Sequence, residues 1–350
     1  MFTIVSGIGL LLVTLAGFSL FSLKMPKGQL AMSGMANAAI ATFLVEAVHK
    51  YITGDLLGLD FFRSLGETAG GLGGVAAAAM VPICMGANPV LAIVAGVAVG
   101  GYGILPGFIA GYIIGLIAPV IEKKLPEGLN LIGGALLIAP AARLIVIAVN
   151  PAVNATLATI GGTISAATEQ SPIVMGFLLG GIIKMICTSP LSSMALTAML
   201  GLDGLAMGIA AIACVGGSFT NGLIFSRLKL GDRSNVIAVM LEPLTQADII
   251  TSNPLPIYCS NFFGGGFAGI SAAVFHIVNN APGTASPIPG LLAPFAFNPA
   301  THVIGALAFA VIGGCLAGVV GSRVFRQKIK VPAVPANNDE RGQTPVATGF

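Results

Sequence analysis

The side chains best suited to binding a polar solute lie in one apolar stretch, residues 236–260. Its polar residues are Glu242, Gln246, Asp248, Thr251, Ser252 and Asn253, and prolines interrupt it at 243, 254 and 256. A carboxylate at membrane depth is costly and marks a functional site by default. Proline ends helices, and irregular backbone survives at that depth only where protein covers it or where it lines a wet cavity. The stretch therefore predicts a re-entrant or broken helix pair that lines a polar site.

Composition indicates what must position this stretch. The chain has 350 residues, of which 55% are hydrophobic and 8% charged, whereas soluble domains carry about 25% charged residues. We therefore expect an all-α, polytopic membrane protein. The net charge of +3 is small and scattered, so no nucleic-acid partner is expected. The sequence shows no metal-ligand cluster and no nucleophile–base arrangement, so a membrane enzyme ranks last among the functions and no cofactor is expected.

Apolar runs predict roughly nine or ten crossings, because about 20 residues span the bilayer. The expected spans are 2–23, 30–50, 68–86, 89–103, 105–121, 129–149, 172–187, 205–225, 259–278 and 301–322. Polar or proline-rich stretches predict re-entrant, partial or interfacial elements at 150–170, 188–204, 236–258 and 279–299. Residues 1–330 are expected to form one domain, followed by a disordered cytoplasmic tail at 331–350.

Basic residues predict the orientation. Lys24 and Lys27 follow the first span, and Arg323 and Arg326 follow the last, which places the N-terminus outside and the C-terminus in the cytoplasm. Two spans separate the basic loop 226–235 from the C-terminal basic cluster, so 236–258 and 279–299 must each return to their own side. Between Lys124 and that loop the count is odd: either 150–170 crosses, one segment does not, or the loop at 122–127 is outside.

Several helix starts can be predicted from dipeptides. Asn-Pro occurs at 88–89, 150–151, 253–254 and 298–299, and Ser-Pro at 171–172, 189–190 and 286–287. Asn and Ser are good N-caps and proline suits the first helical position. Each pair could hold a polar solute at a half-helix tip, or could simply begin an ordinary helix.

Three other charged groups lie within apolar runs. Glu46 with Lys50 could form an interfacial salt bridge, or Glu46 and His49 could belong to a polar site. Arg143 must face protein or water. For Lys184 the simplest expectation is that its ammonium reaches the membrane interface.

Five motifs together resemble the perfringolysin O regulator-like proteins, which are classed with the enzyme IIC subunits of the bacterial phosphotransferase system. They read AMSGMANAAIATFLVEAVHKY, EQSPIVMGFLLGG, TSPLSSMALTAMLGLDGL, EPLTQADIITSNPLPIY and VNNAPGTASPIPGLL. The resemblance runs from about residue 30 to 320. It implies a dimeric, enzyme IIC-like sugar permease of the bacterial inner membrane, which moves its substrate by shifting a substrate-binding domain against a scaffold domain.

The resemblance also bears on the site. Glu242-Pro243 is similar to a glutamate–proline pair that binds sugar hydroxyls on a re-entrant hairpin of glucose-type enzyme IIC proteins, although the neighbouring residues differ. Nothing here resembles a phosphorylated IIB or IIA domain, so any phosphorylation of the sugar would need separate IIB and IIA proteins. This chain would then hold only the acceptor.

The leading hypothesis is a permease for a small polar solute, most simply a sugar. The expected binding residues are Glu242, Gln246, Asp248 and Asn253, then Asn279, Asn280 and Thr284, then Ser189, Ser192 and Ser193, with Glu46 and His49 also considered. Glu242 could instead cap a half-helix, and Asp248 could reach the interface. The alternative function is a membrane sensor or regulator that binds a ligand without transporting it.

Overall fold

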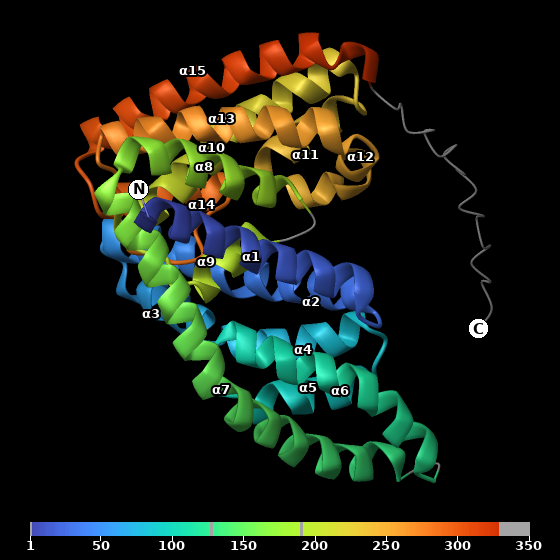
Figure 1. Cartoon of the computed structure of the whole chain (residues 1–350). Coiled ribbons are helices and arrows are strands. Elements are labelled where there is room, and N and C mark those ends of the chain that lie inside the picture. Colours follow the sequence, from blue (N-terminus) through green and yellow to red (C-terminus); the bar gives the residue numbers. More distant parts are fainter. Residues whose placement is uncertain (1, 127–128, 190–191, 329–350) are drawn as a thin grey trace, which may run out of the picture.

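The computed structural model describes residues 2–126, 129–189 and 192–328, and this part of the chain is helical with turns and no strands (Figure 1). The expected all-α membrane fold is confirmed. The predicted tail at 331–350 lies outside the described residues. Two groups of packed helices lie one above the other in Figure 1, with α1 (Phe2–Lys24) and α2 (Gly28–Ala39) between them.

The first group consists of α4 (Gly73–Cys84), α5 (Pro89–Ala98) and α6 (Ile104–Lys124), which pack on one another, and α2 packs on α4 and α6. Asn88 begins α5 as predicted, because its side-chain oxygen accepts a hydrogen bond from the Val90 amide at 2.9 Å. The break expected between residues 103 and 105 is confirmed by the separate α5 and α6.

The second group consists of α8 (Pro172–Thr188), α10 (Gly204–Leu228), α13 (Pro254–Val274) and α15 (Ala300–Val324). Small residues let these backbones approach closely. On α8, a Cβ at Gly176 would lie 2.7 Å from the carbonyl oxygen of Gly269, and one at Gly180 would lie 2.6 Å from that of Gly265. Glycine spacing four residues apart on both helices therefore sets the closest contact in this group.

Helix α7 (Asn130–Gln170) joins the two groups, and it corrects the sequence analysis. A span at 129–149 followed by a separate element at 150–170 was expected, but one 41-residue helix continues through Pro151. Its first half packs against α5 and α6 through Ile138 and Ala142, and its second half packs against α1 and α8 through Ile164. At about 1.5 Å per residue α7 is about 60 Å long, twice the bilayer core, so it cannot cross as one upright span.

After α2 the chain continues as π-helix in the region of Glu46, His49 and Lys50. Residues Ile40–Leu44 (η1) and Ala47–Leu56 (η2) are π-helical, a form that is rare and frequent at functional sites. Helix α3 (Asp60–Gly71) follows and meets α4 at a bend of 54°. This bend carries the glycine-rich sequence at 70–74.

Short helices make up the interrupted segments. The stretch singled out above contains α11 (Arg233–Leu241), the 3-10 helix η3 (Pro243–Gln246) and α12 (Ala247–Ser252), and α13 begins after Asn253. Elsewhere α9 (Ser193–Met199) follows α8, and α14 (Pro287–Leu292) with η4 (Ala293–Ala296) precedes α15. A last turn, η5, covers Arg326–Lys328. The segments 236–258 and 279–299 are therefore broken, as expected.

Six described helical segments are long and apolar enough to cross a membrane, or seven if the bent α3–α4 pair counts as one span. Helices α5 and α8 are shorter apolar helices, so the count of nine or ten stays a prediction. Helices α1, α6, α10 and α15 each have a basic residue in their last turn. Their C-terminal ends lie on one side of the molecule, the right in Figure 1.

The dipeptide predictions have mixed outcomes. Ser171, Asn253 and Ser286 each precede a helix start, as predicted. Asn150-Pro151 instead lies inside α7. At Ser189-Pro190 the proline lies outside the described residues, and α9 is capped by Ser192.

Candidate functional site

Glu242 lies where α11 ends and η3 begins, with its side chain turned into the protein. Its carboxylate accepts hydrogen bonds from the Leu244 amide at 3.5 Å and from the Ser286 hydroxyl at 3.3 Å. Glu242 lies outside the spanning helices, and burial raises the pKa of its carboxyl above the ordinary value. The hydrogen bonds and the charge of Lys184 oppose that rise. The carboxylate thus caps a half-helix and also links η3 to the segment before α14.

Lys184 is fully buried in α8, so the expectation that it reaches the interface was wrong. Its aliphatic stem fills the space beside Gly217 of α10 and Gly265 of α13, where an added Cβ would overlap it. Its ammonium donates to the carbonyl oxygen of Cys214 at 3.4 Å and forms no ion pair within the described chain. The glycines make room for a lysine that the sequence alone placed at the surface.

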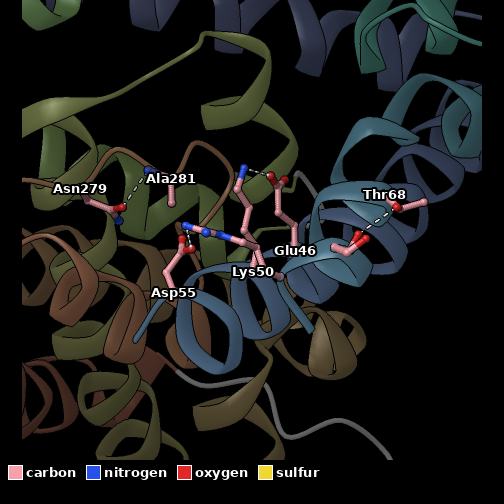
Figure 2. Close-up of polar contacts among 8 residues, drawn as sticks. Glu46, Lys50, Asp55, Thr68, Asn279 and Ala281 are labelled. Atoms are coloured by element: carbon pink, nitrogen blue, oxygen red, sulfur yellow. Dashed lines mark hydrogen bonds and ion pairs between the residues drawn. The ribbon is translucent and has the colours of Figure 1, made fainter. Parts of the chain in front are cut away.

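The segment 279–286 folds around its own polar side chains. Asn279 donates to the Thr284 hydroxyl at 2.8 Å and accepts from the Ala281 amide at 3.0 Å, a contact drawn in Figure 2. Asn279 and Thr284 are both buried. Ser193 of α9 donates to the carbonyl oxygen of Ala285, next to Ser286, which binds Glu242. We call Lys184, Ser193, Glu242, Asn279, Thr284 and Ser286 the hairpin cluster.

The remaining predicted residues are more scattered. Asn280 accepts a hydrogen bond from the Gly204 amide at the start of α10, and Ser192 caps α9. Gln246 accepts from Asn235 at 2.7 Å. His49 stacks on the Phe62 ring at 5.4 Å.

Three predicted residues belong to the hairpins themselves. Asn253 is buried and donates to the carbonyl oxygen of Ile249, and Ser189 donates to that of Ile186. Asp248 belongs to α12, and its side chain lies outside the described residues. The predicted set is therefore not gathered in one place.

Two cavities border the helical segment Gly28–Leu56. The larger, which we call the groove, has a volume of about 1080 Å³ and a mainly apolar lining. Its walls come from α1 and α2 on one side, and from α8, η3, α12 and α13 on the other. Of the predicted site residues whose side chains the structure describes, only Ser189 lines it. Leu244, Ala247 and Thr251 of the hairpin also contribute to its wall.

The second cavity, which we call the Glu46 pocket, has a volume of about 350 Å³. Its polar side chains are Glu46, Tyr51, Tyr102 and Asn154, and its remaining lining is Phe43, Gly70, Gly71, Gly73, Gly74, Gly103, Ile104, Leu105, Pro106, Leu157, Ala198, Met199 and Pro282. Glu46 is the only residue here that the sequence analysis singled out. Tyr51 lies on the same helical segment as Glu46, whereas Tyr102 and Asn154 come from parts of the chain far away in sequence.

The two cavities follow one another along a single helical segment, Gly28–Leu56. The groove contacts its residues from Gln29 to Ile40, and the Glu46 pocket contacts those from Phe43 to Tyr51. Phe43 lies between them, and Gly283 is wedged against it: a Cβ there would lie 3.0 Å from Phe43 and 3.3 Å from Ala198. Gly283 has a φ of +84°, which suits glycine in this position.

Comparison with known families gives the class of this membrane protein. Residues 30–335 match the family described as Phosphotransferase system, EIIC. The chain belongs to this family. The match covers most of this EIIC chain, including the hairpin cluster and the Glu46 pocket. Helix α1 lies before the matched residues. No curated protein and no solved structure matches.

Membership confirms the classification with the enzyme IIC permeases, and it supports sugar transport with phosphotransferase partners in general terms. The sequence analysis of this EIIC protein did not single out Tyr51, Tyr102 or Asn154, which line the Glu46 pocket. It named Lys184 but did not predict its burial. Arg143 gives a partial signal: it had to face protein or water, and it lies over the ring of Tyr102 at 4.8 Å. Its guanidinium also donates to the carbonyl oxygens of Ala98 and Gly100.

Proposed function

We propose that this EIIC protein is a permease that carries a sugar between its two helix groups. The observation that carries the proposal is the pair of cavities in series along Gly28–Leu56, one small and partly polar, one large and mainly apolar. Phe43 and Ala198 line the Glu46 pocket and Gly283 packs against both, and we propose that this packed layer separates the two cavities. A passage interrupted by one packed layer suits a carrier that opens to one side at a time.

The hairpins supply the polar groups along this passage. Ser189, Leu244 and Thr251 border the groove, and Glu242 lies two residues before Leu244 in the chain. We propose that the solute meets the hairpin cluster, and Glu242 in particular, after it passes Phe43. Gln246, Asp248, Asn253 and the serines Ser189, Ser192 and Ser193 remain proposed contacts on this route.

We further propose the orientation and assembly expected of the class. The basic ends of α1, α6, α10 and α15 lie together, so that side is the cytoplasmic side by the positive-inside rule. On this proposal the loop after α6 is cytoplasmic and the N-terminus is outside, in a bacterial inner membrane. A homodimer and separate IIB and IIA proteins complete the proposal.

The test is sugar uptake into proteoliposomes that contain the full chain. Glu242→Gln removes the charge but keeps the shape, and hydrogen bonds to charged groups are worth about 1.5–3 kcal/mol, so accumulation should fall about tenfold or more. The Glu169→Gln variant changes an exposed carboxylate at the end of α7 and should leave uptake unchanged.

One outcome contradicts the permease and another contradicts the role of Glu242. Folded wild-type protein that binds a sugar but gives no time-dependent accumulation would be a sensor or regulator. Full uptake by monodisperse Glu242→Gln protein would remove Glu242 from the route.

A further inference from the structure

We propose that the Glu46 pocket is where the sugar first binds, and that it accepts one neutral sugar ring and excludes anionic sugars. This inference rests on the proposed permease function and adds the site and the ligand class. It assigns binding roles to Tyr51, Tyr102 and Asn154 beside Glu46. The geometry points to this pocket because carboxylate, hydroxyl and amide groups converge on a cavity that the chain leaves unfilled.

One oxygen of the Glu46 carboxylate accepts a hydrogen bond from the protein, and the other does not. Oε1 accepts from the Lys50 ammonium at 3.3 Å, as Figure 2 shows. The carboxylate packs on the α-carbon of Gly70, where a Cβ would overlap Oε2. Oε2 accepts no hydrogen bond within the described chain. A sugar hydroxyl can donate to this oxygen, while the ion pair with Lys50 holds the carboxylate in place.

Two tyrosines supply apolar faces and hydroxyl groups. The Tyr102 ring lies under the Arg143 guanidinium, which the carbonyl oxygens of Ala98 and Gly100 hold at 3.2 and 2.9 Å. Tyr51 is buried, with its ring centroid 5.7 Å from that of Phe297. The Tyr102 hydroxyl has no hydrogen-bond partner in the described chain, so it can bind a solute hydroxyl. Rigid aromatic rings with a polar end suit a sugar, which has apolar C–H faces and polar edges.

Glycines keep the space open. A Cβ at Gly74 would overlap the carbonyl oxygen of Tyr102, and one at Gly70 would overlap the Glu46 carboxylate. Nothing lies within 4 Å of the position where a Cβ of Gly71 would point, so this glycine faces open space at the pocket wall. The run at 70–74 therefore brings the α3–α4 bend close to Glu46 and Tyr102 without filling the pocket.

Size and charge define the ligand class. A volume of about 350 Å³ is at the low end of small-molecule sites, which are about 300–1,000 Å³, and suits one sugar ring. Glu46 is the only charged side chain among the described lining residues, and Lys50 is not part of the lining. A carboxylate or phosphate on the sugar would meet the Glu46 charge without a lining cation, and like charges repel.

The experiment measures sugar binding to the full chain in detergent, by thermal shift and calorimetry, so it does not depend on transport. The probes are D-glucose, D-mannose, D-galactose, N-acetyl-D-glucosamine and D-mannitol, with D-glucuronate as the anionic counterpart. At least one neutral probe should bind, and D-glucuronate should bind at least tenfold more weakly. Glu46→Gln should weaken neutral-sugar binding about tenfold or more, and Tyr102→Phe about threefold.

The matched control is Glu169→Gln, an exposed carboxylate at the end of α7 and outside the pocket, which should bind as the wild type does. If Glu46→Gln does not fold, a Gly71→Cys variant provides a second readout. The neutral sugar should slow its labelling by a small thiol reagent, measured above the labelling of the five native cysteines.

Three results overturn the inference: no neutral probe binds, D-glucuronate binds as tightly as the neutral sugars, or Glu46→Gln and Tyr102→Phe both keep wild-type affinity. In each case the permease stands if uptake depends on Glu242. Absence of uptake by the wild-type protein together with normal sugar binding at Glu46 would instead contradict the permease and leave the pocket in place.

Discussion

In the hairpin cluster, polar side chains bind other parts of the chain, whereas the Glu46 pocket keeps some of its polar groups available. Asn279, Thr284 and Ser193 all hydrogen-bond within the cluster and are buried. Around the Glu46 pocket, the Glu46 and Tyr102 side chains each present a polar atom to a cavity of about 350 Å³. Polar residues of this apolar chain therefore have two arrangements: some hold broken helices together, and others line a cavity.

The largest expected difference between the two regions lies in their tolerance of an added methyl group. Gly265→Ala would place a Cβ 2.6 Å from the carbonyl oxygen of Gly180 and against the stem of Lys184. Backbone must shift to relieve this contact, so the free energy of unfolding should fall by about 1–3 kcal/mol. Gly71→Ala meets nothing within 4 Å and should change it by less than about 0.5 kcal/mol.

Melting temperatures of the two variants in detergent, without ligand, check this difference. The reverse ranking would mean that the glycines of α13 are not packed as described. A loss of sugar affinity in Gly71→Ala alone would sharpen the contrast, because its methyl group enters the Glu46 pocket.

A pair of asparagines tests the same contrast with hydrogen bonds. Asn279→Ala leaves the Ala281 amide without its acceptor and the Thr284 hydroxyl without its donor, both in buried surroundings. This should destabilise the fold by about 1–3 kcal/mol. Asn154→Ala removes only an exposed contact to Asn150, so stability should hold while sugar affinity falls. Equal melting temperatures for the two variants would show that the segment 279–286 is not held by Asn279.

The sequence could predict the membrane class, the broken segments and Glu242 as a buried carboxylate, because composition and proline positions act locally. Asn150-Pro151 shows the limit: the same dipeptide that begins α13 lies within α7, because α7 packs against other helices along its whole length. Lys184 shows a second limit of prediction from sequence, because its burial depends on Gly217 and Gly265 from two other helices. The Glu46 pocket combines residues from several separate segments, and no local pattern brings them together.

Arg143 gives the smallest effect and the closest test of how the pocket is held. It lies outside the pocket lining, but its guanidinium covers the Tyr102 ring at 4.8 Å and is fixed by two carbonyl oxygens at the end of α5. A cation–π contact at an exposed site is worth about 0.5–1 kcal/mol, so Arg143→Gln should weaken neutral-sugar binding about twofold to fivefold. Arg143→Lys keeps the charge but not the planar group that spans both carbonyls, so its sugar affinity should fall between those of wild type and Arg143→Gln.

A double variant separates a structural role from a positioning role. If Arg143 is only structural, Arg143→Gln and Arg143→Gln/Tyr102→Phe should both have a lower melting temperature, and Arg143→Gln should not change the affinity. A positioning arginine should lose most of its effect on affinity once Tyr102 has lost its hydroxyl, because the group that it orients is then gone.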